Sequence, residues 1–206
     1  MFPWPNFPQS TKGVARIPDH LEIERRFLVD AREEKPWREA GVHHAIEQHY
    51  GVGNHLHLEQ DVLFCGEVSV VTLSEEQVSM FTQSDDWVSR LRQRGDDWFL
   101  TYKSRRSKDT AFELEWVVRH AAARAIMACG PFPSIQKTRY VWTSATGDCW
   151  EIDEFEEGLA GLVLAEIELE DAGQEVTIPA WVGQEITGLS SWSNRALAET
   201  LGSRTD

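Results

Sequence analysis

Charged and apolar residues alternate near the start of the chain with the repeat of an extended strand. Glu22, Glu24 and Arg26 stand two positions apart. Ile23 and Phe27 occupy the intervening set of positions. Because successive side chains of a strand point to opposite faces, the three charged groups share one face. The pattern predicts a strand whose polar face is densely charged.

The same alternation recurs later in the chain. The charged sets are Arg90, Arg92 and Arg94; Lys103 and Arg105; Glu113 and Glu115; Lys137 and Arg139; Glu151 and Asp153; and Glu166, Glu168 and Glu170. Bulky residues such as Leu91, Trp116 and Ile167 take the alternate positions. These segments predict an antiparallel sheet with one apolar and one charged face.

Each charged set carries one sign, with Arg26 the main exception. Cross-strand ion pairing on a solvated face, at roughly 0.2–1 kcal/mol per pair, is one explanation. Solvated faces usually mix charged and neutral residues more freely. Carboxylate strands beside cationic strands suit a ligand of divalent metal plus phosphate, because metals choose carboxylate oxygen and phosphoryl oxygens choose Arg and Lys. Closing the sheet would turn its charged face into a tunnel wall.

Short motifs in these segments follow the order of a known family. Glu22-x-Glu24-x-Arg26 is similar to the Glu-x-Glu-x-Lys signature of CYTH domains, the triphosphate tunnel metalloenzymes. The later motifs are Ser89-Arg-Leu-Arg92, Leu100-Thr-Tyr-Lys-Ser104, Phe112-Glu-Leu-Glu115, Gln136-Lys-Thr-Arg-Tyr140, Trp150-Glu-Ile-Asp153, Leu164-Ala-Glu-Ile-Glu168 and Asn194-Arg-Ala-Leu-Ala198. The resemblance implies an α+β fold: a closed antiparallel β-barrel of about eight strands, with a charged interior and helices packed outside.

The resemblance also implies roles for the charged residues. Those implied to hold Mg²⁺ or Mn²⁺ are Glu22, Glu24, Asp153, Glu166 and Glu168. Those implied to bind the triphosphate are Arg26, Arg90, Arg92, Lys103, Lys137 and Arg139. Glu113 and Glu115 either complete the acidic wall or pair with cations. Catalytic roles fall to Arg26 and to Lys103, which would assist deprotonation of water if neighbouring cations lower its pKa.

The implied activity is metal-dependent hydrolysis, in which water attacks the terminal phosphorus of a small triphosphate in line. The family includes inorganic triphosphatases, thiamine triphosphatases and class IV adenylyl cyclases. Since no motif announces adenine, we rank inorganic tripolyphosphate first, thiamine or nucleoside triphosphates second and ATP cyclisation third. A catalytically inactive polyphosphate-binding module is the alternative from another class, and the retained carboxylates favour an enzyme over it.

Two departures from the family pattern concern the basic positions. Arg26 replaces the usual Lys, which keeps the charge but exchanges a compact ammonium for a planar fork. Ser190 and Ser191 stand where many relatives carry Lys or Arg, and Arg195 is the candidate substitute.

A third departure lies between residues 43 and 84. The strand before the Arg-rich segment has two candidate positions, 48–50 and 60–62, and residues 66–84 resemble an insertion that could serve as a lid. Ser74-Glu-Glu-Gln77 has the form of a capping box for a helix there. Histidines gather in the same region, at His43, His44, His49, His55 and His57. The pair His55-x-His57 could bind metal, although surface histidines are the simpler interpretation.

Length and breaker residues predict one tunnel domain at 20–202, preceded by a proline-rich arm at 1–19. Helices are expected at 117–129 and 193–201, each followed by glycine, and a shorter one at 179–187. We interpret these helices as scaffold.

Composition narrows the partners. A net charge of −14 disfavours nucleic acid, whose partners usually present a positive face. The chain has three cysteines, Cys65, Cys129 and Cys149, with no Cys-x-x-Cys, which favours a reducing cytoplasm over a disulfide framework or zinc site. No apolar run predicts a membrane span or a secretory signal. We expect a small-molecule substrate and a monomer or homodimer.

Overall fold

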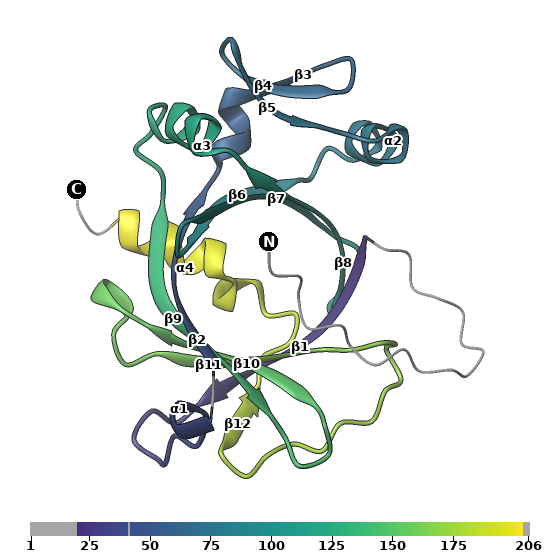
Figure 1. Ribbon diagram of the computed structural model, residues 1–206. Coiled ribbons are helices and arrows are strands. Elements are labelled where there is room, and N and C mark those ends of the chain that lie inside the picture. Colours follow the sequence, from purple (N-terminus) through teal and green to yellow (C-terminus); the bar gives the residue numbers. More distant parts are fainter. Residues whose placement is uncertain (1–19, 41, 204–206) are drawn as a thin grey trace.

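Eight strands of the computed structural model close into a barrel around a central tunnel (Figure 1). The structure describes residues 20–40 and 42–203, so the predicted arm at 1–19 lies outside the described residues. The barrel strands are β1 (Leu21–Val29), β2 (Val42–Tyr50), β6 (Val88–Arg94), β7 (Asp97–Arg105), β8 (Thr110–Val118), β9 (Ser134–Thr143), β10 (Cys149–Phe155) and β11 (Val163–Glu168). Their order is β11-β10-β9-β2-β6-β7-β8-β1, and antiparallel pairing of β1 with β11 closes the ring. The predicted fold class is confirmed.

The strand register turns the alternating charged residues into the tunnel. At the β1–β11 seam, Glu24 lies opposite Glu168 and Arg26 lies opposite Glu166. Ile23 and Phe27, at the alternate positions of β1, are buried in an apolar cluster outside the barrel. The charged interior is therefore a direct consequence of the period-two pattern.

Charge is divided between two halves of the tunnel wall. Strands β8, β1, β11 and β10 are consecutive around the ring and carry most of the inward carboxylates. Strands β9, β2, β6 and β7 complete the ring and carry most of the inward cations. We call these the acidic half and the basic half, and Arg26 is the exception in the acidic half.

Residues 52–83 lie outside the barrel, beside β6 and β7 (Figure 1). They form a 3-10 helix (Val52–His55), a sheet of β3 (Leu56–Glu59), β4 (Val62–Cys65) and β5 (Val68–Thr72), and helix α2 (Glu75–Gln83). Leu63 and Val70 are buried in one cluster with Leu100 of β7. The capping box of Ser74 and Gln77 at α2 is confirmed. Because this layer packs on the outer wall, the lid hypothesis is wrong.

The strand that precedes the Arg-rich segment is β2, so the structure decides for residues 48–50 over residues 60–62. Residues 60–62 lie instead where β3 turns into β4. The segment outside the barrel begins at Val52 and is therefore longer than the predicted 66–84.

Helix α3 (His120–Met127) confirms the helix predicted within 117–129, and it starts later because Val117 and Val118 still belong to β8. The helix predicted at 179–187 is wrong. Strand β12 (Val182–Glu185) pairs there with the last residues of β1, Phe27 to Val29. An ion pair of 2.7 Å between Arg25 and Glu185 joins the two strands. This long-range pairing outweighs local helical preference.

Helix α4 (Asn194–Gly202) confirms the last predicted helix, and Ser193 caps its first turn. A short 3-10 helix (Ser190–Trp192) precedes it. The chain also forms the short helix α1 (Trp37–Ala40) and a further 3-10 helix (Glu157–Leu159). Ala198 of α4 is fully buried against Ile135, Phe155 and Leu164, which occupy inward positions of the barrel. Helix α4 thus packs into one apolar end of the tunnel and is not an outer helix. No helix in the described part of the chain is long and apolar enough to cross a membrane.

Candidate active site

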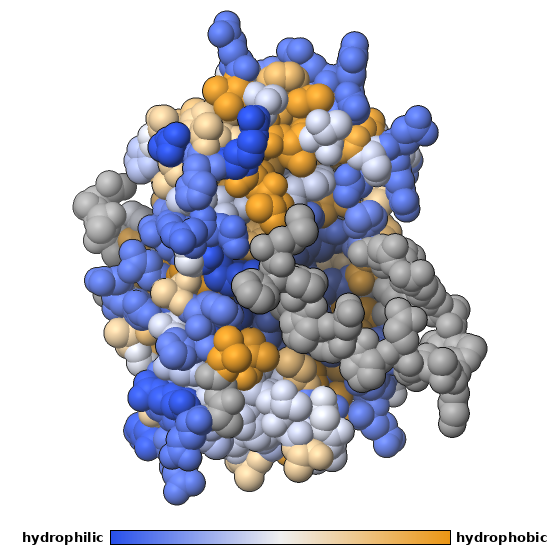
Figure 2. All heavy atoms as spheres, viewed as in Figure 1, coloured by the Kyte–Doolittle hydropathy of each residue, from blue (hydrophilic) through white to orange (hydrophobic). Residues whose placement is uncertain are grey.

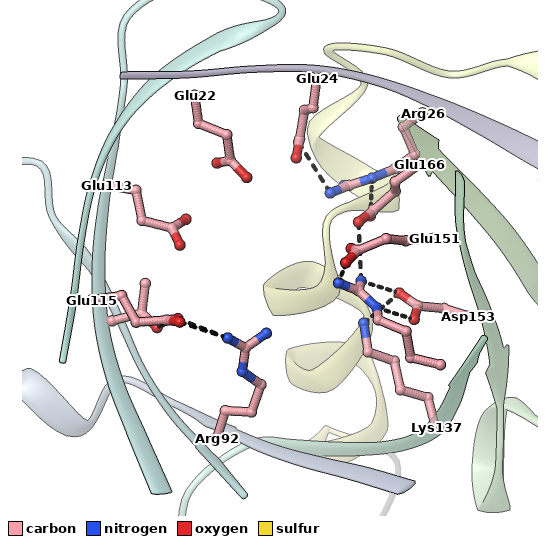
Figure 3. Close-up of polar contacts among 12 residues, drawn as sticks. Glu22, Glu24, Arg26, Arg92, Glu113, Glu115, Lys137, Glu151, Asp153 and Glu166 are labelled. Atoms are coloured by element: carbon pink, nitrogen blue, oxygen red, sulfur yellow. Dashed lines mark hydrogen bonds and ion pairs between the residues drawn. The ribbon is translucent and has the colours of Figure 1, made fainter. Parts of the chain in front are cut away.

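The tunnel interior contains a polar cavity of about 120 Å³ that both halves of the wall line. Its lining residues are Glu22, Glu24, Arg26, Arg90, Arg92, Glu113, Glu115, Arg139, Glu151, Glu166, Glu168 and Asn194. A second cavity of about 330 Å³ shares part of this wall and also reaches Lys103, Ser190 and Arg195. Figure 3 shows the carboxylates and cations pointing toward one another across this space. Most of the predicted site residues therefore meet in one place.

Lys103 of the basic half contacts the acidic half. Its Nζ forms an ion pair with Glu22 and lies 3.4 Å from Glu24 Oε2 and 3.7 Å from Glu113 Oε2. Burial opposes the positive charge, but the three carboxylates outweigh it and raise the pKa of Lys103. The prediction that neighbouring cations lower this pKa is wrong, because carboxylates surround the ammonium.

Negative charge is crowded in the rest of the acidic half. Within the described chain, the carboxylate of Glu168 makes no hydrogen bond or ion pair. Partial desolvation in the tunnel, together with the neighbouring carboxylates Glu22 and Glu151, raises the pKa of Glu168 to about 8, although its side chain still reaches solvent. Burial also raises the pKa of Glu22, even though Lys103 opposes that shift. A divalent cation held by carboxylate oxygen would relieve this repulsion.

The acidic half holds a cation of the protein itself. Among residues 20–40 and 42–203, no three His, Cys, Asp or Glu side chains are grouped as metal ligands. Lys103 stands between Glu22, Glu24 and Glu113 and supplies positive charge there. The carboxylate oxygens of this half nevertheless have the donor chemistry that a hard divalent ion prefers.

Arg26 bridges two carboxylates of the acidic half (Figure 3). Its Nη2 lies 3.2 Å from Glu24 Oε1, and its Nε lies 2.7 Å from Glu166 Oε1. The second contact is an ion pair without a hydrogen bond, because the N–H of Nε does not point at the oxygen. Burial opposes the charge, but Glu166 and Glu24 outweigh it and raise the pKa of Arg26. The planar guanidinium contacts both carboxylates at once through different nitrogens, whereas a lysine ammonium has only one nitrogen for the two contacts.

Asp153 holds the two cations of β9 in place. Arg139 donates to both of its carboxylate oxygens at 2.7 Å, and Lys137 Nζ lies 2.5 Å from Oδ2. These cations outweigh burial and hold the pKa of Asp153 well below its ordinary value. Arg139 also forms ion pairs with Glu151 and Glu166. Asp153 is a predicted metal ligand, yet both of its oxygens contact cations here.

Glu115 has the same relation to the arginines of β6. Its carboxylate lies 3.2 Å from Arg90 Nη2 and 2.8 Å from Arg92 Nη2, and Thr101 donates to it at 2.7 Å. Burial and neighbouring Arg90 lower the pKa of Arg92 to about 10, so Arg92 keeps its charge at neutral pH. Of the two interpretations of Glu115, the structure supports pairing with cations.

Three buried donors of the basic half have no hydrogen-bond acceptor in the part of the chain that the structure describes. They are Gln48 Nε2, Arg90 Nε and Arg92 Nε. A buried donor without an acceptor costs free energy, and such groups in native proteins usually mark a site for water or a ligand. Phosphoryl oxygens are acceptors and would pair with these donors.

Sequence reasoning missed the uncharged members of the wall. Gln48 and Tyr50 of β2 lie opposite Arg92 and Arg90, and Thr101 lies two residues before Lys103. Extending the period-two rule to polar residues without charge would have found all three. Asn194 lines the cavity from the start of α4, and no sequence pattern marks it.

The histidines do not form the metal site that His55-x-His57 could indicate. His55 packs on Phe132, and His57 lies 3.2 Å from Glu59. His43 packs on Tyr140, at the outward face of β9. The interpretation as surface histidines fits these three, whereas for His49, which is buried in β2, it is wrong.

A sequence model of the CYTH domain matches residues 74–196, which is more than half of the chain. The chain belongs to the CYTH domain family. Among curated relatives of this CYTH protein, the inorganic triphosphatase of Nitrosomonas europaea is 31% identical over 148 residues, or 66% of this chain and 89% of the relative. The inorganic triphosphatase of Acetivibrio thermocellus is 35% identical over 112 residues, or 53% of this chain and 70% of the relative.

A solved structure supports the same relationship at the level of the fold. The crystal structure of an inorganic triphosphatase superposes with a TM-score of 0.51 and 25% identity. The match covers 86% of the CYTH protein and 93% of that chain.

Proposed function

We propose that this CYTH protein is a metal-dependent hydrolase of inorganic triphosphate. The observation that carries the proposal is the division of one tunnel wall into an acidic and a basic half around a shared cavity. One half suits a divalent cation and the other suits a chain of phosphoryl groups. The names of the two curated relatives support inorganic triphosphate as the substrate.

The basic half binds the substrate. Arg90, Arg92 and Arg139 line the cavity and are held by Glu115 and Asp153, so their positions are fixed before substrate arrives. Lys137 lies fully buried behind them and adds positive charge. Such preorganised cations stabilise the charge on the phosphoryl oxygens in the transition state.

Glu22, Glu24 and Glu168 are the residues that we assign to the metal, Mg²⁺ or Mn²⁺. The Glu168 carboxylate has no ion pair in the described chain, and Glu22 and Glu24 share Lys103. Asp153 and Glu166 are instead each held by an arginine at 2.7 Å. We assign Asp153 and Glu166 to positioning Arg139, Lys137 and Arg26. The bound metal would supply Lewis acidity and lower the pKa of a nearby water.

In the hydrolysis step, the oxygen of a water molecule bonds to the terminal phosphorus while the bridging P–O bond breaks. Pyrophosphate leaves with the bonding electron pair, and the proton of the water passes to a carboxylate of the acidic half. Lys103 keeps its proton, since the surrounding carboxylates raise its pKa. It therefore acts as a cation on the phosphoryl oxygens and not as the base.

Arg26 bears on the alternative of an inactive binding module. The replacement of Lys by Arg leaves a cation in the tunnel wall, in contact with Glu24 and Glu166. Arg195 and Ser190 line the larger cavity, where Arg195 pairs with Glu199 at 2.7 Å. Both departures thus leave positive charge along the tunnel.

Three cysteines without disulfide or zinc spacing favour the cytoplasm as the compartment.

The test is to incubate purified protein with tripolyphosphate, thiamine triphosphate and ATP, each with Mg²⁺, Mn²⁺ or chelator, and to identify the products by phosphorus NMR. We expect phosphate and pyrophosphate from tripolyphosphate only when metal is present. The double variant Glu22→Gln/Glu24→Gln should lose turnover, whereas the exposed control Glu67→Gln should keep it. Cyclic AMP from ATP, or saturable binding without turnover, would contradict the proposal.

A further inference from the structure

Two thiols meet outside the tunnel, where helix α3 packs on the outer sheet. Cys65 ends β4, the middle strand of that sheet, and Cys129 follows α3 (Figure 1). Their sulfur atoms lie 3.7 Å apart, although 64 positions of the chain separate them. A disulfide has a sulfur–sulfur distance of about 2.05 Å. A small approach of the two side chains is therefore enough to bond them.

Ordered structure holds both thiols in this position. Cys65 is paired on both sides, with Leu56 of β3 and with Val68 of β5. The Cys129 amide donates to the Ile126 carbonyl oxygen at 3.0 Å, at the end of α3. Ile126 is fully buried and belongs to the same apolar cluster as Cys65. The short distance between the sulfurs is thus a result of packing between two regular elements.

The two thiols differ in their access to solvent. Cys129 is exposed, whereas the exposed fraction of Cys65 is 5%. Burial and the hydrogen bond with Cys129 raise the pKa of Cys65 to about 11. Since a reagent must reach the sulfur, and since the thiolate is the attacking form, Cys129 is the thiol that reacts first. Cys65 then lies beside the reacted sulfur, and this proximity favours a second attack from within the protein.

We propose that Cys65 and Cys129 form a reversible disulfide by exchange with a small disulfide such as oxidised glutathione. Cys129 loses its proton and bonds to one sulfur of the reagent, whose own S–S bond breaks and releases one thiol. Cys65 then loses its proton and its sulfur attacks the Cys129 sulfur, which releases the second thiol. Two protein thiols are oxidised, and the reagent is reduced to two thiols.

The bond would join the outer layer to the barrel. Residues 52–83 pack on the barrel wall through an apolar cluster that includes Leu63, Val70 and Leu100. The disulfide would add a covalent link from this layer to the connection between β8 and β9. Disulfides in a reducing compartment are usually transient, which agrees with a bond that thiols can remove. Neither cysteine is among the residues that line the two tunnel cavities, so the inference does not depend on the proposed function.

Mass spectrometry of the folded protein tests the bond and the order of attack. Every chain carries Cys149→Ser, so that Cys65 and Cys129 are the remaining thiols. After incubation with oxidised glutathione, we expect the mass to fall by two hydrogen atoms and a peptide map without reductant to join Cys65 to Cys129. Adding Cys65→Ala should stop the reaction at a glutathione adduct on Cys129. Adding Cys129→Ser should leave the mass unchanged, because the reagent does not reach Cys65.

Thermal unfolding gives a second readout and verifies that each variant is folded. The disulfide closes a loop between positions that are 64 residues apart, which restricts the unfolded chain. We expect the oxidised form to have a Tm higher by about 5 °C or more, and dithiothreitol should abolish the difference. The Cys65→Ala and Cys129→Ser variants should show no such rise with oxidised glutathione.

Several results would overturn the proposal. One is a folded chain whose thiols stay unreacted, and another is a glutathione adduct that persists on Cys129 although Cys65 is present. Linkage that appears only in urea would show that the pairing does not belong to the folded protein. Glutathione on Cys65 in the Cys129→Ser variant would overturn the order of attack, and an unchanged or lower Tm of the oxidised form would exclude a bond that fits the native packing. A protein without triphosphate turnover would contradict the proposed function and leave each of these readouts in force.

Discussion

The acidic and basic halves of the tunnel wall differ in how completely their charges are paired. In the basic half, Asp153 and Glu115 reach across to bind the cations of β9 and β6. In the acidic half, the Glu168 carboxylate has no hydrogen bond or ion pair within the described chain, and partial desolvation and neighbouring carboxylates raise its pKa to about 8. The cations of the basic half are thus held by carboxylates of the protein itself, whereas the Glu168 carboxylate of the acidic half can be paired only by a cation from outside.

The largest effect on the pairing of the basic half should come from Asp153→Asn. Lys137 would stay fully buried without its nearest negative partner, and Arg139 would lose its two contacts with the Asp153 carboxylate and keep those with Glu151 and Glu166. We expect the free energy of unfolding to fall by about 3–5 kcal/mol. Urea unfolding measures this, with exposed Asp171→Asn as control. A loss under about 1 kcal/mol would mean that the basic half does not depend on Asp153.

Glu168→Gln should act on the acidic half in the opposite sense. Removing an unpaired carboxylate relieves repulsion, so the metal-free protein should keep or increase its Tm. Stabilisation by Mn²⁺ should disappear, and hydrolysis of tripolyphosphate should fall about 10²-fold. Thermal unfolding with and without Mn²⁺, together with phosphate release, checks both. Undiminished stabilisation by Mn²⁺ would exclude Glu168 as a ligand.

A smaller effect is expected from Arg26→Lys, which restores the family residue. A single ammonium would replace a fork that contacts Glu24 and Glu166 together. We expect KM for tripolyphosphate to rise about threefold to tenfold, with Tm nearly unchanged. Steady-state kinetics measures the change, and Arg25→Lys on the outward face of β1 is the control. A lower KM would show that Arg26 impairs the site.

The smallest predicted effect is a dependence of stability on pH in the metal-free protein, because solvent screens the exposed Glu168 side chain. The raised pKa of Glu168 means that the folded state binds its proton between the ordinary value of 4.5 and about 8, while the unfolded state does not. Stability is therefore highest at the acidic end of this range and falls as pH rises through it. Unfolding in chelator at several pH values should show this slope, and Glu168→Gln should reduce it. An unchanged slope in the variant would assign it to other groups.

Much of the fold was accessible from alternation alone. The charged sets of β6, β8 and β11 repeat every second residue, and this period fixes which face is polar. Strand order is not contained in such a pattern. The surroundings of Lys103 depend on β7 placing it near β8 and β1, and so the expected cations were replaced by carboxylates.

The ends of the barrel were harder to predict for a similar reason. The Ala and Leu residues of α4 suit an outer helix as well as one that packs on Ile135 and Phe155 inside the barrel. Strand β12 forms because it pairs with the free edge of β1, and the sequence of residues 182–185 does not indicate this long-range pairing. Gln48 and Tyr50 follow the period, but only the register shows which cations they accompany.

The seam between β1 and β11 also determines when the molecule can be completed. Strand β1 pairs with residues 110–112 of β8 and with residues 164–168 of β11. During synthesis β1 must therefore wait until residue 112 for one barrel neighbour and until residue 168 for the other. Until β11 emerges from the ribosome, β1 and β10 present open edges, and Glu24 and Glu166 cannot come together. The tunnel half that would carry the metal is consequently the last part of the barrel to be built.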